Sequence, residues 1–334
     1  MSRNEPLMTM TEVIEAEDVC EIVADAHSYA LAGTTEQQYG YRFRVFESYC
    51  DLVGKQALPA SPDTVLGFLA VQSRRTAPRC VKLFKSAIRS RHVMADLPDP
   101  TATAMIDKFI SGISRKYGMA VIKKKALRTD EIRSICINYD RDGGLVAMRG
   151  KAALMTGFFG CLRASELVHI RIDHIEFCPE GLTIRIPKSK TDQEGAGQIV
   201  AIPRGAKPET DPVLAVEEWL EALAERLEVD KVETGPLLPA LRRLASEAQR
   251  VFPVPITMTR YRLIIKQAVE GIGLDPAAYS GHSCRSGHAT SAARAGASRD
   301  DIKRQGRWQS DDVVSGYIQE GTKFKDNSCN SLGL

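Results

Sequence analysis

The chain has 334 residues, of which 43% are hydrophobic and 26% are charged, and its formal net charge is only +3. This length fits two domains, and any basic face must come from segregation of charge. No stretch approaches the ~18 apolar residues of a membrane span, and the N-terminus lacks the apolar run of a signal peptide. The eight cysteines include no CxxC pair. We therefore expect a cytoplasmic protein without a disulfide framework or a zinc site.

Helical signals alone fill the chain up to about residue 118. Four helix starts are marked by capping or proline signals, namely Thr35 with Gln38, Ser61 with Pro62, Thr76 with Pro78, and the break at Pro98 and Pro100. We expect a helical domain over residues 31–118. Residues 1–30 are predicted to form an N-terminal extension that is partly helical.

The third of these helices carries a basic face. Residues 74–95 contain seven lysines and arginines and no acidic residue. Lys82, Lys85 and Arg89 recur at i, i+3 and i+7 beside an apolar stripe, a pattern suited to DNA phosphates or a major groove. A solvated basic face is nearly as common an explanation for any one of these residues.

A linker is predicted over residues 119–128, where three consecutive lysines precede a helix start at Thr129. Lys123 and Lys124 in this run are candidates for contact with a phosphate backbone, although most such runs are simply solvated. The residues that follow, 129–334, are predicted to form a second domain.

The second domain is predicted to be helical with a small sheet. Residues 182–186 and 198–202 alternate in polarity around a polar turn at 187–197, which predicts a β-hairpin. Residues 168–172 form either a third strand or a connection, and the pattern does not decide between them. After Pro212 the pattern predicts only helices, at about 212–227, 257–270, 285–296, 299–305 and 311–318. The fold class is thus mainly α with a small β-sheet.

Five side chains in this domain carry most of the chemical information: Arg163, His282, Arg285, Trp308 and Tyr317. Arginines bind phosphate in a bidentate manner, histidine moves protons, an indole N–H donates a hydrogen bond, and a tyrosine can become covalently joined to phosphorus. No acidic cluster has convincing Mg²⁺ spacing, so we expect no metal. A metalloenzyme would instead be inhibited by EDTA.

Each of these residues also has an ordinary structural explanation. His282 could cap a helix, and Trp308 and Tyr317 could be packed in a core. Glu166 lies three residues after Arg163 and could orient it, but exposed helices often carry such pairs. The combination is what makes the pattern informative.

In this order, the segments GHSCRSG (281–287), ARAGAS (293–298), GRW (306–308) and YI (317–318) closely resemble the tyrosine site-specific recombinases of the phage integrase family. The resemblance covers the C-terminal domain strongly and the N-terminal domain only loosely. It implies a helical core-binding domain over 31–118 and a tyrosine recombinase catalytic domain, α with minor β, over 129–334. It also implies catalysis without a cofactor.

The resemblance assigns a role to each residue that matches the motif. Tyr317 would be the nucleophile that forms a 3′-phosphotyrosine, and Arg163 and Arg285 would clamp the phosphate. His282 would be the general acid or base, Trp308 a hydrogen-bond donor, and Glu166 a structural support.

Two further assignments follow from the same resemblance. The family lysine, general acid toward the leaving 5′-oxygen, falls in the predicted hairpin turn. Lys188 and Lys190 are both candidates, and the following Thr191 favours Lys190. Residues 258–262, which include Arg260 and Arg262, resemble a groove-facing helix where relatives place a base-reading arginine, and Arg260 is the candidate for that role. A solvated basic face is nearly as common an explanation.

The implied partner is double-stranded DNA with inverted-repeat recombination sites. A homodimer would bind each site and a homotetramer would form at synapsis, in the cytoplasm at the nucleoid. Two alternatives remain. A type IB topoisomerase or a resolvase would share the chemistry but would not join ends from different duplexes. A sequence-specific DNA-binding protein would have lost catalysis, and the presence of every named catalytic side chain argues against it.

Overall fold

The computed structural model describes residues 33–118, 123–187, 197–243, 249–325 and 328–332. The chain divides into two compact units, residues 1–122 and 123–334, each with its own hydrophobic core. Among the described residues, no helix has the length and apolar character needed to cross a membrane.

The described part of the first unit is helical. Its helices are α3 (Gly33–Val53), α4 (Pro62–Arg75), α5 (Pro78–Met94) and α6 (Ala104–Tyr117). Ser61 caps α4 by accepting a hydrogen bond from the backbone of Thr64, as its sequence predicts. Phe46, Phe68 and Phe84 stack edge to face through the core, with ring centroids 5.1 and 5.3 Å apart.

The second unit is built around helix α8 (Leu145–Phe159), which is buried along most of its length. Small residues on α8, such as Ala152 and Ala153, let its neighbours pack closely. These neighbours include α7 (Thr129–Asp142), α10 (Pro212–Leu227), α11 (Met258–Glu270) and α12 (Ser283–Ala295). Trp219 anchors α10 by donating from its indole nitrogen to the carbonyl of Leu237 at 2.8 Å.

The predicted hairpin is confirmed. Strands β2 (Gly181–Ile186) and β3 (Gln198–Pro203) pair antiparallel, and Ile186 lies opposite Gln198 at the end of the ladder. The third strand is β1 (Ile175–Cys178), which pairs with β2 and gives the sheet order β1-β2-β3. Residues 168–172 do not form it, because the backbone there follows the short helix α9 (Ala164–Leu167) into a 3-10 turn at Ile172–His174.

The expectation of helices alone after Pro212 is wrong. Strands β4 (Pro239–Arg243) and β5 (Gln249–Pro255) form a second antiparallel pair, in which Arg242 lies 5.0 Å from the ring of Phe252. Pro239 begins β4, and Pro253 and Pro255 lie near the end of β5; these prolines hide the alternation, since proline normally argues against a strand. The prediction that a helix begins at residue 285 is also two residues late.

Residues 123–128 run along the second unit, while 119–122 lie outside the described residues. Lys125 and Leu127 donate backbone hydrogen bonds to the carbonyls of Ala278 and Ser283, at 2.8 and 3.0 Å. Gly287 permits this approach, because a Cβ at that position would lie 2.1 Å from the carbonyl oxygen of Leu127. The segment therefore packs directly on the first turns of α12.

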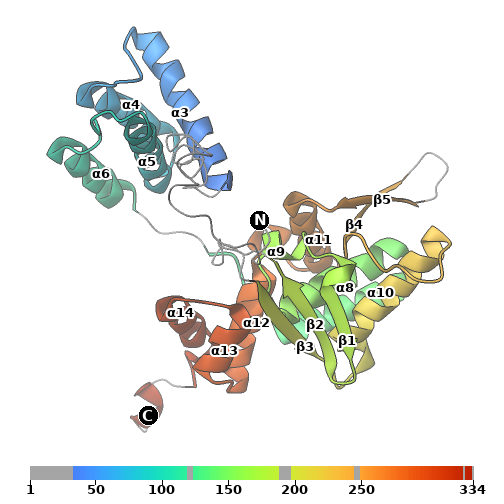
Figure 1. Ribbon diagram of the computed structural model, residues 1–334. Helices are drawn as coiled ribbons and strands as arrows, with labels where there is room; N and C mark the ends of the chain where they lie inside the picture. The colour runs from blue at the N-terminus through green and yellow to red at the C-terminus, as the bar shows by residue number, and fades with distance from the viewer. Residues whose placement is uncertain (1–32, 119–122, 188–196, 244–248, 326–327, 333–334) are drawn as a thin grey trace, which may run out of the picture. The chain divides into compact units, whose positions relative to one another are not determined.

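The last described helices form a group of their own, drawn orange to red in Figure 1. Helices α12, α13 (Arg299–Gly306) and α14 (Asp311–Thr322) pack on one another around Ala289, Ala293, Ile302 and Val314. Gln305 ties this group to the sheet by donating to the carbonyl of Ala201 at 3.0 Å. The remaining short 3-10 helices are Pro208–Thr210, Pro276–Ala278 and Ser328–Ser331.

Candidate active site

The structure brings His282 and Tyr317 together from different helices. His282 stands at the N-terminus of α12 and Tyr317 lies in the middle of α14. The Nε2 atom of His282 is 3.2 Å from the Oη atom of Tyr317, which is a hydrogen-bond distance. The tyrosine ring also packs against Trp308, with ring centroids 5.3 Å apart.

Arg285 lies one helical turn after His282 and is 1% exposed. It donates from Nη1 to the carbonyl of Cys161 and from Nη2 to the carbonyl of Gly306. Its guanidinium lies 4.4 Å from the ring centroid of Trp308. A Cβ at position 306 would lie 1.8 Å from that ring, so glycine is needed there. Burial lowers the pKa of Arg285 to about 10, which leaves it charged at neutral pH.

Arg163 and Glu166 form a capping box at the start of α9. Glu166 accepts from the backbone nitrogen of Arg163 at 2.9 Å and from its Nη1 at 2.6 Å. The same carboxylate pairs with Arg307 at 2.7 Å. Although burial of Glu166 favours the neutral acid, the charge of Arg307 and the hydrogen bonds from Arg163 outweigh it and lower the pKa of this carboxyl.

The turn between α8 and α9 links Arg163 and Arg285. Cys161 adopts a left-handed backbone conformation, with φ of 47°, two residues before Arg163. This conformation is uncommon for a residue other than glycine. The carbonyl of Cys161 accepts from Arg285, so the turn that carries Arg163 also holds Arg285 in place.

The titration behaviour of the central pair suits proton transfer from tyrosine to histidine. Partial desolvation, followed by the charges of Arg285 and Arg163, lowers the pKa of His282. Its imidazole is therefore neutral near pH 7 and able to accept a proton. Burial raises the pKa of Tyr317 despite the opposing charge of Arg285, so the phenol needs a base.

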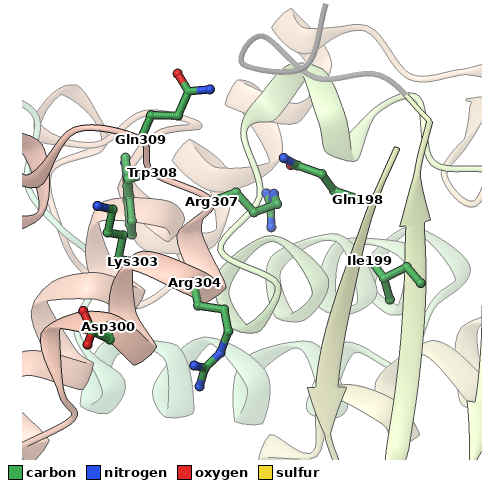
Figure 2. Close-up of a pocket in the computed structure, with 8 residues that line it drawn as sticks. All are labelled: Gln198, Ile199, Asp300, Lys303, Arg304, Arg307, Trp308 and Gln309. Carbon is green, nitrogen blue, oxygen red and sulfur yellow. The ribbon is translucent and has the colours of Figure 1, made fainter. Parts of the chain in front are cut away.

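Lys188 and Lys190 lie outside the described residues. Strand β3, which follows them, begins at Gln198 in the lining of an open pocket of about 520 Å³, and this lining also includes Arg307 and Trp308. Figure 2 shows Arg307 between the segment that carries Trp308 and the start of β3 at Gln198. The choice between the two lysines remains a sequence-based prediction.

The seven candidate DNA-contacting residues are divided between the two units. In the first unit, Lys82 is exposed on α5, Lys85 pairs with Asp107 at 2.6 Å, and Arg89 pairs with Asp99 at 3.3 Å. Surface pairs of this kind are weak enough to exchange for phosphate contacts.

In the second unit the remaining candidates lie on α11 and on the entering segment. Arg262 is exposed on α11 and Arg260 is partly buried there. Lys123 is exposed, and Lys124 donates to the carbonyl of Ala277 at 2.5 Å. All seven residues remain candidates for DNA contact.

Comparison with known proteins decides the family. Residues 125–323 match the phage integrase family. An integrase/recombinase XerD homolog from Selenomonas ruminantium is 30% identical over 304 residues, which cover 90% of this chain and 86% of that protein. The chain belongs to the phage integrase family. It is thus a tyrosine recombinase, an enzyme that transfers DNA strands.

One further relative supports this assignment, and two solved structures share the fold. Recombinase Cre of Escherichia phage P1 is 27% identical over 285 residues, which cover 83% of this chain and 81% of Cre. A lambda integrase dimer bound to a COC′ core site has a TM-score of 0.58 at 14% identity, over 92% of this chain and 95% of that chain. A lambda integrase tetramer bound to a Holliday junction has a TM-score of 0.57 at 14% identity, over 92% and 77%. These structures show that the tyrosine recombinase fold is shared.

Arg307 and Cys161 are the residues at the site that sequence reasoning missed. Arg307 immediately precedes Trp308 in the motif, where it was read only as part of the GRW segment. One signal for Arg307 was available. It directly follows a short helix, at the point where the chain often needs a left-handed conformation and usually has glycine. Cys161 gave no comparable signal.

Proposed function

We propose that this tyrosine recombinase is site-specific and cleaves and rejoins DNA strands through a 3′-phosphotyrosine at Tyr317. The observation that carries the proposal is the 3.2 Å separation between Nε2 of His282 and Oη of Tyr317, beside the guanidinium group of Arg285. A nucleophile, a base and a phosphate-binding cation thus meet at one point.

In the first step, Oη of Tyr317 attacks the scissile phosphorus and forms a new P–O bond. His282 accepts the phenolic proton, in keeping with its lowered pKa and the raised pKa of Tyr317. The P–O5′ bond breaks, and Lys190 supplies a proton to the leaving 5′-oxygen. Arg163 and Arg285 would stabilise the charge that develops on the non-bridging oxygens.

The second step reverses the first with a different 5′-hydroxyl. That oxygen attacks the phosphotyrosine and gives its proton to Lys190, the bond to Oη breaks, and Tyr317 regains its proton from His282. One phosphoester replaces another in each step, so the exchange is nearly isoenergetic and needs neither ATP nor a cofactor.

We further propose that residues 31–118 act as a core-binding domain and residues 129–334 as the catalytic domain on DNA. Two protomers would bind the inverted repeats of one site, and a tetramer would join two sites. Lambda integrase, which shares the fold, is known both as a dimer on a core site and as a tetramer on a Holliday junction. The basic residues that would bind phosphates are Lys82, Lys85, Arg89, Lys123, Lys124, Arg260 and Arg262.

The decisive experiment compares the full chain with its Tyr317→Phe variant. The probe is the duplex that the full chain enriches from a random-sequence pool, nicked so that a covalent product is trapped. We expect a denaturation-resistant adduct on the 3′ end with the wild-type chain, none with the variant, and no effect of EDTA. An adduct formed by Tyr317→Phe would reject Tyr317 as the nucleophile.

A second arm separates recombination from topoisomerase-like rejoining. Two duplexes of different length, each carrying the enriched sequence, are incubated together with the full chain. A recombinase joins ends from different duplexes and yields products of intermediate length. Supercoil relaxation without such products would instead support the topoisomerase alternative.

A further inference from the structure

Arg307 holds a backbone conformation that glycine would adopt more easily. It follows the last residue of α13 and has φ of 55° and ψ of 43°. Helices commonly end with a left-handed residue at this point, and that residue is usually glycine because a Cβ is disfavoured there. Here the glycine stands one position earlier, at Gly306, where the ring of Trp308 leaves no room for a Cβ. An arginine that tolerates this conformation calls for an explanation.

The side chain of Arg307 is only 6% exposed. It donates from Nη2 to Glu166 at 2.7 Å, and from Nη1 to the carbonyls of Gly160 and Gln305 at 3.3 and 3.0 Å. Its Nε is buried and has no hydrogen-bond partner among the described residues. A buried charge with an unpaired donor is a poor means of stabilising a fold. Stability alone therefore does not explain why arginine stands at this position.

The contacts of Arg307 converge on the supports of both clamp arginines. Glu166 holds Arg163 through two hydrogen bonds. The carbonyl of Cys161, which accepts from Arg285, also lies 3.5 Å from Nη2 of Arg307. The guanidinium of Arg307 thus contacts both Glu166, the partner of Arg163, and the carbonyl of Cys161, the partner of Arg285.

From these contacts we infer that Arg307 is a positioning residue, which fixes Glu166 and the turn at 160–163 so that Arg163 and Arg285 address the same phosphate. The inference rests on the proposed function, because the phosphate is the scissile one. It adds a residue that touches neither the nucleophile nor the base in the structure.

The positive charge of Arg307 should also strengthen phosphate binding at the site. Three guanidinium groups and one carboxylate leave a local charge of about +2, whereas Arg163, Arg285 and Glu166 alone would leave about +1. Sharing Glu166 with Arg307 also means that the carboxylate does not fully neutralise Arg163. Arg163 is then free to bind phosphate more strongly.

The test is Arg307→Gly, with Glu228→Gly as its matched control. Glu228 is exposed, ends α10 in the same left-handed conformation, with φ of 57°, and lies on a helix that contributes none of the site residues. Both substitutions relieve the backbone, but only the first removes a contact of Glu166. We expect Arg307→Gly to lower single-turnover cleavage of the enriched, nicked duplex by at least about tenfold. Its melting temperature should fall, because Glu166 loses one of its two buried guanidinium partners, so cleavage is measured at a temperature where the variant is fully folded. Its DNA affinity should stay within about twofold.

Glu228→Gly should cleave at the wild-type rate, and Arg307→Lys should fall between Arg307→Gly and wild type. Cleavage by Arg307→Gly at the wild-type rate would overturn the inference. So would a loss of cleavage that comes with a lower melting temperature and disappears on cooling, since that marks a folding role.

A second readout separates this inference from the proposed function. If wild type forms no Tyr317 adduct, the proposed function fails, and a crystal structure of Arg307→Gly then judges the inference. Movement of Glu166 and loss of its hydrogen bond to Nη1 of Arg163 would support it. Retention of both contacts between Glu166 and Arg163 would overturn it.

Discussion

The guanidinium of Arg285 lies 4.4 Å from the ring centroid of Trp308, and the same ring packs against Tyr317. Trp308 therefore contacts both the group that would bind the phosphate and the group that would attack it. Its aromatic body and its indole N–H have separable roles, because phenylalanine keeps only the first.

Trp308→Phe and Trp308→Ala should separate those roles. Trp308→Ala removes the packing surface of both neighbours and should lower the free energy of unfolding by about 2 kcal/mol, less than the ~3–5 kcal/mol of a fully buried ring. It should also reduce cleavage by about 10² or more, because Tyr317 loses its position. Trp308→Phe should remain close to wild type in urea denaturation and lose about tenfold or less in cleavage. Equal losses for the two variants would contradict this division.

The pH dependence of cleavage should follow His282. A base must be deprotonated to act, and the pKa of His282 is lowered from its ordinary value of 6.5. Single-turnover cleavage should therefore rise with pH on a limb whose midpoint lies below 6.5, and then level off. The raised pKa of Tyr317 places ionisation of the free phenol above pH 10, so it should not shape the profile near neutrality. The His282→Gln variant should not show this rise of cleavage with pH. If the rise persists in the variant, it must come from the titration of another group.

The lysine assignment predicts a chemical rescue. Lys190→Ala should lose cleavage of the ordinary phosphodiester, because the leaving 5′-oxygen then lacks a proton donor. A substrate with sulfur in place of the bridging 5′-oxygen should restore cleavage, since a thiolate leaves without protonation. Lys188→Ala is the matched control and should cleave both substrates at near wild-type rates. Rescue of Lys188→Ala instead would exchange the roles of the two lysines.

Glu166→Gln should be destabilising in a pH-dependent manner. The folded-state pKa of Glu166 is lowered from 4.5, so its stabilising effect is present above pH 4.5 and is lost as pH falls through the folded pKa. At neutral pH the variant should lose about 3 kcal/mol, because two guanidinium groups lose a buried partner. The difference in melting temperature between wild type and variant should shrink below pH 4.5.

A second Arg-x-x-Glu capping box supplies the control for that variant. Glu131 accepts from the backbone of Arg128 at 2.8 Å and also from Tyr279 at 3.0 Å, at the start of α7. Glu131→Gln should destabilise the protein while leaving cleavage per folded molecule unchanged. Glu166→Gln should reduce cleavage even at temperatures where it is fully folded.

The sequence alone predicted the helix starts and strands that are marked by local residue patterns. Ser61 marks the start of α4, and the alternation of residues 182–186 and 198–202 marks a hairpin that the structure confirms. The β4–β5 pair was missed because its prolines break the same alternation. Local signals thus failed where proline stands at the ends of a strand.

At the site, the sequence motifs identified the candidate residues, but only the structure shows that these residues lie close together. His282 and Tyr317 are separated by 35 positions, yet the packing of α12 against α14 brings them within hydrogen-bond distance. Arg307 was not predicted, because its partner Glu166 lies 141 positions away and no periodicity links the two. The assignment of Lys190 remains a prediction from the sequence.

Gly287 has no side chain, and this has a consequence for the whole candidate active site. A methyl group there would collide with the carbonyl of Leu127, whose own amide is bonded to Ser283. Ser283 directly follows His282 and lies two residues before Arg285, in the first turn of α12. Displacing the segment that enters this unit would therefore shift both His282, the proposed base, and Arg285, a proposed phosphate-binding residue, although neither side chain would have been altered chemically.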